Sequence, residues 1–398
     1  MRRRRTRDAA GPRRIDRIRR RSGRGLSALA AALLVVAVPA ASASPAFADQ
    51  TRESQWALDF LHVTEAQETS QGDGVTVGMI DTGVDADHPD LRGNVRTGTD
   101  AWNNWHGDGQ HDRDGHGTAM ASLIAGHGHG SGDGIEGVAP EAKILPVDVQ
   151  RPGGYIGGDA TGYGIRWAVD HGATVINVSV GGGSSAVEEE AVRYALAHDA
   201  VVVAAVGNTA DGSVSVQAPA SYDGVIAVGS VGRDGKFSST SVSDYRTDVV
   251  APGVDIAEAR PDGRYATGTG TSDASAIVSG AAALIRSRFP DLTGEQVRQR
   301  LLQTVTDRGP KGHDDRYGDG VLNVVRALDS RVTVTGSPSP TLSVAAAPTD
   351  NAAMRDGGSG VSDVLVPVVE LLVLLALIAL VGWLVVRRRR RKRQPTGP

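Results

Sequence analysis

Ser272 stands where a turn rich in glycine and threonine passes into a run of small residues that favours a helix. A serine hydroxyl at this position lies beside the unpaired amides of a helix N-terminus, which stabilise negative charge on a bound carbonyl. Taken alone, Ser272 fits an ordinary helix N-cap equally well. A nucleophilic serine also needs a base, an acid that orients the base, and a donor for the oxyanion.

Three further segments supply those groups. Asp81 ends an apolar run, and the carboxyl ends of parallel strands face the crevice in which α/β folds bind ligands. His116 lies between two glycines that permit close backbone approach. Asn208 follows another apolar run, and its amide can donate to an oxyanion. Each has a structural alternative: a turn cap for Asp81, a buried structural histidine for His116, and a turn residue for Asn208. The combination with Ser272 nevertheless predicts a serine protease.

Alternating short apolar runs and longer periodic stretches are expected to position these residues. Nearly continuous runs of Val, Ile and Ala, typical of strands buried on both faces of a parallel sheet, span residues 75–80, 144–149, 175–180, 200–206 and 225–231. Helices are predicted over residues 157–171, 185–198, 272–288 and 293–304, the second with Ser184 or Ser185 as its cap. This alternation indicates an α/β domain whose sheet is covered on both faces.

The order Asp81, His116, Asn208 and Ser272, with the sequences around them, resembles the subtilisin-like serine proteases, the subtilases of peptidase family S8. The resemblance extends from about residue 55 to 328 and includes residues 175–182, 219–222, 225–229 and 250–254. It implies a subtilisin-like three-layer α/β/α fold with a mainly parallel central sheet. It also implies an endopeptidase that hydrolyses peptide bonds through an acyl-enzyme.

The same resemblance assigns roles within the site. Ser272 is expected to attack the scissile carbonyl, His116 to act as general base, and Asp81 to hold the imidazole tautomer. Asn208 and the Ser272 amide are expected to donate to the oxyanion. The substrate main chain is expected to pair, as an added strand, with a cleft formed by Ser179, Val180, Gly181, Ala204, Ala205 and Gly207.

The segment directly after the nucleophile departs from the subtilase pattern. The family pattern is Met-Ala-Ala-Pro-His, whereas this chain has Asp-Ala-Ser-Ala-Ile at residues 273–277. The Asp273 carboxylate either opposes the oxyanion or stabilises the helix N-terminus, and slower or more selective catalysis is expected. The alternative function is a catalytically weak or inactive subtilase fold that serves as a structural or binding subunit of a secretion complex.

Metal catalysis is not expected. The histidines in the loops rich in Gly and Asp lack a matched set of acidic residues, so no metal site and no required cofactor are predicted. A structural calcium ion near residues 108–114 remains open, since subtilases often bind calcium, but solvated carboxylates explain this loop equally well.

The two ends of the chain predict export and anchoring. Residues 1–48 read as a signal peptide, basic and then apolar, with cleavage after Ala48 or Ala43. A catalytic domain is expected over residues 49–331 and a tether rich in Pro, Ser, Gly and Ala over residues 332–363. One C-terminal transmembrane helix over residues 364–386 would precede a basic cytoplasmic tail at residues 387–398.

This plan resembles the mycosins, membrane-anchored subtilases associated with type VII secretion in actinobacteria. The expected localisation is the cell membrane, single-pass type I, with the catalytic domain outside the cytoplasm. Residues 49–362 carry 23 Lys and Arg against 42 Asp and Glu, which argues against nucleic acid as a partner and favours polypeptide substrates. The chain has no cysteine, although mycosins often carry disulfides.

Overall fold

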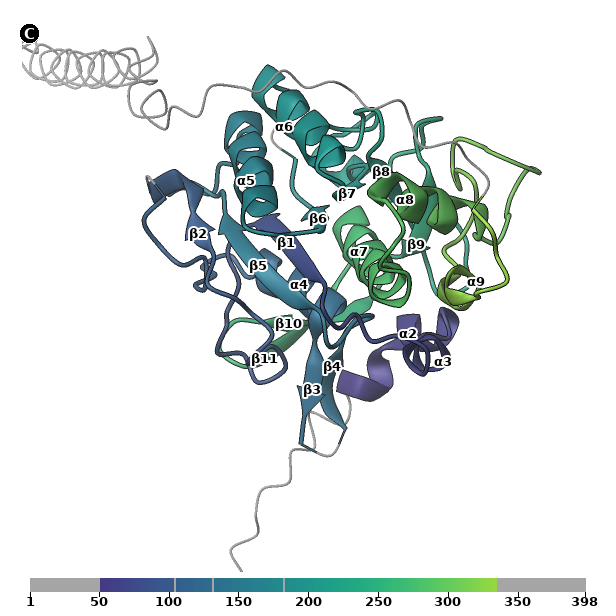
Figure 1. The fold of residues 1–398 in the computed structure, drawn as a ribbon, viewed down its shortest axis with the longest axis horizontal. Coiled ribbons are helices and arrows are strands. Elements are labelled where there is room, and N and C mark those ends of the chain that lie inside the picture. Colours follow the sequence, from purple (N-terminus) through teal and green to yellow (C-terminus); the bar gives the residue numbers. More distant parts are fainter. Residues whose placement is uncertain (1–50, 104, 131, 182, 335–398) are drawn as a thin grey trace, which may run out of the picture. The chain divides into compact units, whose positions relative to one another are not determined.

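The computed structural model describes residues 51–103, 105–130, 132–181 and 183–334 (Figure 1). The predicted signal peptide, transmembrane helix and cytoplasmic tail lie outside these residues, as does most of the predicted tether. Among the helices in the described ranges, none combines the length and the apolar character needed to cross a membrane.

A seven-stranded sheet, parallel throughout, forms the centre of the domain in the order β2-β5-β1-β6-β7-β8-β9. Its strands are β1 (Thr76–Asp81), β2 (Thr99–Asp100), β5 (Lys143–Asp148), β6 (Val175–Val178), β7 (Val201–Ala205), β8 (Ile226–Val231) and β9 (Val249–Pro252). The five predicted strands are confirmed. The two outermost strands, β2 and β9, were not predicted as strands.

Helices cover both faces of this sheet (Figure 1). Helices α5 (Gly158–Asp170) and α6 (Ala186–Ala197) pack together on one face, and α4 (His116–Ala125) and α7 (Thr271–Arg288) pack together on the other. The four predicted helices are confirmed, including α8 (Gly294–Gln303). Ser185, rather than Ser184, caps α6 by accepting a hydrogen bond from the Glu188 amide.

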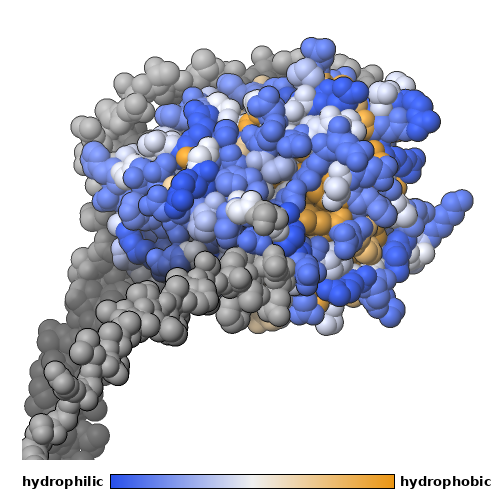
Figure 2. Space-filling view, turned by 90° about the horizontal axis from the view of Figure 1, so that it is seen from below, coloured by the Kyte–Doolittle hydropathy of each residue, from blue (hydrophilic) through white to orange (hydrophobic). Residues whose placement is uncertain are grey.

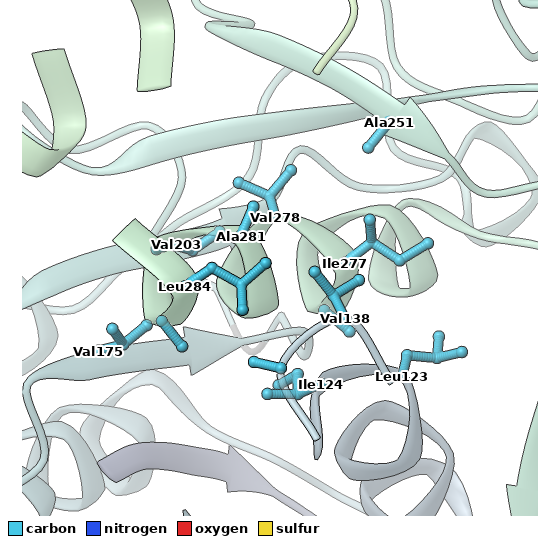
Figure 3. Packing of buried hydrophobic residues seen from close by; sticks show 14 of the residues in the cluster. Leu123, Ile124, Val138, Val175, Val203, Ala251, Ile277, Val278, Ala281 and Leu284 are labelled. Carbon is cyan, nitrogen blue, oxygen red and sulfur yellow. The ribbon is translucent and has the colours of Figure 1, made fainter. Parts of the chain in front are cut away.

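The core beside α4 and α7 consists of apolar side chains that α7 and the sheet bury against each other. Ile277, Val278, Ala281 and Leu284 of α7 are buried within the same cluster as Val203 of β7 (Figure 3). Such continuous burial holds the first turn of α7 in a fixed position, because the helix is anchored along nearly its whole length.

Smaller elements surround this framework. They are the hairpin β3 (His127–His129) with β4 (Asp133–Glu136), the hairpin β10 (Ile256–Arg260) with β11 (Arg264–Gly268), the 3₁₀ turns η1 (Ala101–Asn103) and η2 (Thr209–Asp211), and the helices α2 (Trp56–Phe60), α3 (Val63–Gln67) and α9 (Val324–Leu328). The indole of Trp56 donates to the carbonyls of Val254 and Asp255, which ties α2 to the loop before β10. The face of the molecule in Figure 2 is mostly hydrophilic, with a smaller hydrophobic area.

Candidate active site

An open cleft of about 730 Å³ brings most of the predicted site residues together. His116, at the start of α4, and Ser272, in the first turn of α7, both line it. Asn208 and five of the predicted cleft residues line it as well: Ser179, Val180, Gly181, Ala205 and Gly207. Ala204 does not, because its side chain is fully buried in the core on the α5 and α6 side of the sheet. The alternation of side chains along β7 explains this difference from the sequence prediction.

Asp81 lies behind His116 at the end of β1 and is fully buried. Its Oδ1 atom is 2.8 Å from the Nδ1 atom of His116 and also accepts a hydrogen bond from the Thr82 amide at 2.8 Å. This arrangement leaves the Nε2 atom of His116 as the ring nitrogen available for a proton from another group. Such a fixed tautomer is what a general base oriented by a carboxylate requires.

The electrostatics of His116 reflect several acidic neighbours. Burial lowers the pKa of His116, but the charge and hydrogen bond of Asp81 and the carboxylates of Asp273 and Glu258 outweigh burial. The net result is a pKa of His116 of about 9. His116 is therefore a stronger base than an ordinary histidine, and its neutral form is favoured only at alkaline pH.

Asp112 holds the N-terminus of α4 and thereby positions His116. One carboxylate oxygen of Asp112 accepts from the Thr82 hydroxyl at 2.9 Å and the Gly115 amide at 2.7 Å, and the other accepts from the Thr118 amide at 2.8 Å. The Thr82 hydroxyl in turn accepts from the Gly117 amide at 2.9 Å. Asp112 thus connects the end of β1 to the first turn of α4. Sequence reasoning placed this residue only in a candidate calcium loop.

Ser272 donates its hydroxyl hydrogen bond to the Ser179 carbonyl at 3.0 Å in this structure. The hydroxyl hydrogen is thus directed at the cleft wall formed by Ser179. Catalytic hydrogen bonds often form only when substrate is bound, so this geometry is compatible with a nucleophile at rest.

Asn208 is fixed by hydrogen bonds at both ends of its amide. Its Oδ1 atom accepts from the Thr271 amide at 2.9 Å, and its Nδ2 atom donates to Asp211 at 3.2 Å. The first contact joins Asn208 to the start of α7, directly before Ser272. Asn208 itself lines the cleft next to Ser272.

A buried polar network behind Ser272 was missed in the sequence. The Ser179 hydroxyl lies 2.9 Å from Asn177 Oδ1 and 2.7 Å from the Ser275 hydroxyl, and Asn177 donates to Ser279 at 2.9 Å. These bonds join β6 to the first turns of α7 and fix the position of Ser272 relative to the cleft wall. A polar Asn177 inside an otherwise apolar strand was the available signal.

An acidic pair adjoins Ser272. Asp273 and Glu258 are 3% and 1% exposed, and both belong to residues that line the cleft. Arg260 forms an ion pair with Glu258. Burial, and then the charge of Glu258, raise the pKa of the Asp273 carboxyl well above its usual range. Glu258 and Arg260 were missed in the sequence because nothing in their local pattern links them to residue 273.

The carboxylates of the loop at residues 108–114 accept hydrogen bonds from protein groups. The Asp112 carboxylate accepts hydrogen bonds from protein groups on both oxygens, and Asp108 accepts from the Gln110 amide. Within the described part of the chain, no group of three or more His, Cys, Asp and Glu side chains is arranged to hold a metal ion.

Comparison with known proteins defines the class. Residues 72–320 match the Subtilase family. Subtilisin DY of Bacillus licheniformis is 40% identical over 264 residues, which cover 65% of this chain and 92% of that protein. The chain therefore belongs to the subtilase family, and it is a subtilisin-like serine endopeptidase that acts on polypeptides.

Two solved structures of mycosins, a group within this family, are similar to this chain. MycP1 from the ESX-1 type VII secretion system has a TM-score of 0.64 and 31% identity, covering 72% of this chain and 88% of that chain. The MycP3 protease from the type VII (ESX-3) secretion system has a TM-score of 0.58 and 33% identity, covering 69% and 88%. These likenesses confirm the resemblance to the mycosins.

Proposed function

We propose that Asp81, His116 and Ser272 form the catalytic triad of this endopeptidase. The observation that carries the assignment is the 2.8 Å contact between a buried Asp81 and His116, whose ring opens into the same cleft as Ser272. Ser272 attacks the scissile carbonyl after giving its proton to His116, and His116 passes that proton to the leaving amine. Water then hydrolyses the acyl-enzyme by the reverse sequence of proton transfers.

The remaining cleft residues have supporting roles in this proposal. The Asn208 amide and the Ser272 backbone amide donate to the tetrahedral oxyanion, a contribution of about 10²–10³-fold in kcat for a single donor. Ser179, Val180, Gly181, Ala205 and Gly207 receive the extended substrate main chain. No cofactor takes part in these steps, because all four functional groups come from the chain.

Hydrolysis of a casein substrate tests this assignment. We expect the wild type to cleave casein and Ser272→Ala to lose measurable activity. Ser287→Ala is the matched control, because Ser287 lies at the far end of the same helix. If Ser272→Ala retained wild-type activity, the assignment of the nucleophile would be wrong. If the wild type were inactive while both variants folded, the alternative role as a binding subunit would be favoured.

We further propose that the protein is exported and anchored in the cell membrane with its catalytic domain outside. The basic and apolar sequence of residues 1–48, the apolar residues 364–386 and the basic residues 387–393 support this topology. Truncation after residue 363 is expected to release active enzyme into the medium, while the full chain sediments with membranes. Release of the full chain would contradict the anchor.

An association with type VII secretion rests on the likeness to MycP1 and MycP3. Deletion of the chain is expected to reduce the export of type VII substrates, and re-expression of the wild type is expected to restore it. Restoration by Ser272→Ala as well would assign that role to the folded domain rather than to proteolysis. Unchanged export after deletion would remove the association.

A further inference from the structure

Asp273 has one buried carboxylate oxygen that lacks a hydrogen-bond donor. This oxygen is Oδ1. A Cβ atom built on Gly268 would lie 2.9 Å from Asp273 Oδ1 and 2.7 Å from Glu258 Oε2. The two carboxylate oxygens therefore converge on the space left open by this glycine. The side chains of Asp273 and Glu258 hydrogen-bond to each other, and two carboxyl groups can do so only if one of them carries a proton.

The charges around Glu258 and Asp273 also favour one proton shared by the two carboxyl groups. Arg260, on the same strand as Glu258, supplies one positive charge through its ion pair with Glu258. From the other elements, His116 of α4 and Asp81 of β1 add a base and a further carboxylate. Two ionised carboxylates with one guanidinium leave a net negative charge in a buried position, whereas one shared proton makes the group of three neutral.

We propose that Glu258 and Asp273 hold one proton between them and, together with Arg260, act as a positioning group that leaves no net charge beside Ser272. This inference rests on the proposed function of Ser272 and His116. While the proton is bound, the pair carries a single negative charge, and Asp273 does not oppose the oxyanion. When hydroxide removes the proton at alkaline pH, a negative charge appears one residue from the nucleophile and opposes the oxyanion.

The proposal explains how an acid is accommodated next to the nucleophile. The pair retains its proton because burial and mutual repulsion both disfavour a second charge. The Asp273 position then behaves as a neutral side chain over the working pH range. Loss of the proton from Asp273 affects kcat only at alkaline pH.

Amide variants test the shared proton because an amide N–H group replaces it. In Asp273→Asn the amide donates to Glu258, and in Glu258→Gln the amide donates to Asp273, so each keeps the neutral balance with Arg260. We expect wild-type kcat to fall about tenfold at alkaline pH as the proton leaves. We expect Asp273→Asn to retain its kcat over that range. Asp262→Asn is the control, because this exposed acid lies in the turn between β10 and β11.

Difference infrared spectroscopy tests the pair without any need for activity. The spectrum of full-length Ser272→Ala minus that of Ser272→Ala/Asp273→Asn at neutral pH should contain one protonated-carboxyl band, which Glu258→Gln in the same background also removes. Absence of that band, or an alkaline limb shared by the wild type and Asp273→Asn, would overturn the proposal. An inactive wild type that still shows the band would refute the proposed function and leave the pair supported.

Discussion

The acidic residues at the two helix N-termini beside the cleft differ in their hydrogen-bond partners. At the start of α4, the Asp112 carboxylate accepts hydrogen bonds on both oxygens from the backbone and from threonine hydroxyls. At the start of α7, the Asp273 carboxylate faces Glu258, and one of its oxygens has no donor. Asp112 lies near the proposed base His116, and Asp273 follows the proposed nucleophile Ser272. Of the two carboxyl groups, only that of Asp112 has hydrogen-bond donors for both oxygens.

This difference distinguishes a carboxylate that stabilises the fold from a carboxyl group whose protonation state affects catalysis. A buried carboxylate that is fully hydrogen-bonded contributes to stability and holds its neighbours in position. A buried carboxylate without donors must gain a proton or disturb the groups around it. Mutation of Asp112 is therefore expected to lower stability, whereas mutation of Asp273 is expected to change the alkaline part of the pH dependence.

Removal of the Asp81 charge should give the largest loss on the base side. Asp81→Asn is expected to reduce kcat by about 10⁴-fold, because the amide favours the wrong His116 tautomer. Steady-state kinetics with a chromogenic peptide measures this effect, with the exposed Asp87→Asn as control. A loss below tenfold would show that Asp81 does not orient the base.

The pH profile of the wild type should follow the His116 pKa of about 9. Since the general base must be neutral, kcat/KM should rise with pH, with a midpoint above the ordinary histidine value of 6.5. Activity at pH 7 is then expected to be one to two orders of magnitude below the maximum. An acid limb centred at or below 6.5 would show that the acidic neighbours do not raise the basicity of His116.

A comparison of stabilities should distinguish the two acids directly. Asp112→Asn is expected to lower the free energy of unfolding by about 1–3 kcal/mol, because its amide group presents hydrogens to donors. Asp273→Asn is expected to maintain or increase it at neutral pH. The pKa of Asp273 is raised on folding, so wild-type stability falls as pH rises through the folded value, and the advantage of Asp273→Asn should grow.

Urea unfolding at neutral and alkaline pH measures both variants. Equal destabilisation by Asp112→Asn and Asp273→Asn would remove the distinction between the two helix starts.

Calcium removal should have the smallest effect. The Asp112 oxygens are engaged by protein donors, so treatment with a chelator is expected to leave kcat/KM and Tm unchanged. A lower Tm in chelator, restored by added calcium, would instead reveal a structural calcium site.

The sequence was most informative where local pattern determines structure. Continuous apolar runs identified the five inner strands, because strands buried on both faces need apolar residues throughout. The short edge strand β2 and the proline-containing β9 carry too little of that pattern. Asp81, His116, Asn208 and Ser272 were predicted as site residues because their order and the segments around them together resemble the subtilases.

The partners of these residues depended on tertiary contacts instead. Glu258 meets Asp273 only because the β10–β11 hairpin brings it to the start of α7, where Gly268 leaves room for both carboxyl groups. Asp112 was placed in the correct loop but its role followed from its distances to Thr82 and Thr118. The Ala204 side chain does not line the cleft because side chains alternate along β7, and an unbroken apolar run does not reveal which of them face the core.

Covalent labelling tests the central claim most directly. Full-length protein treated with a fluorophosphonate, digested and mapped by mass spectrometry should carry a single phosphonyl group on Ser272. The label should disappear in Ser272→Ala and persist in Ser287→Ala. A folded wild type that takes no label, or that carries it on another serine such as Ser179 or Ser275, would contradict the proposed triad.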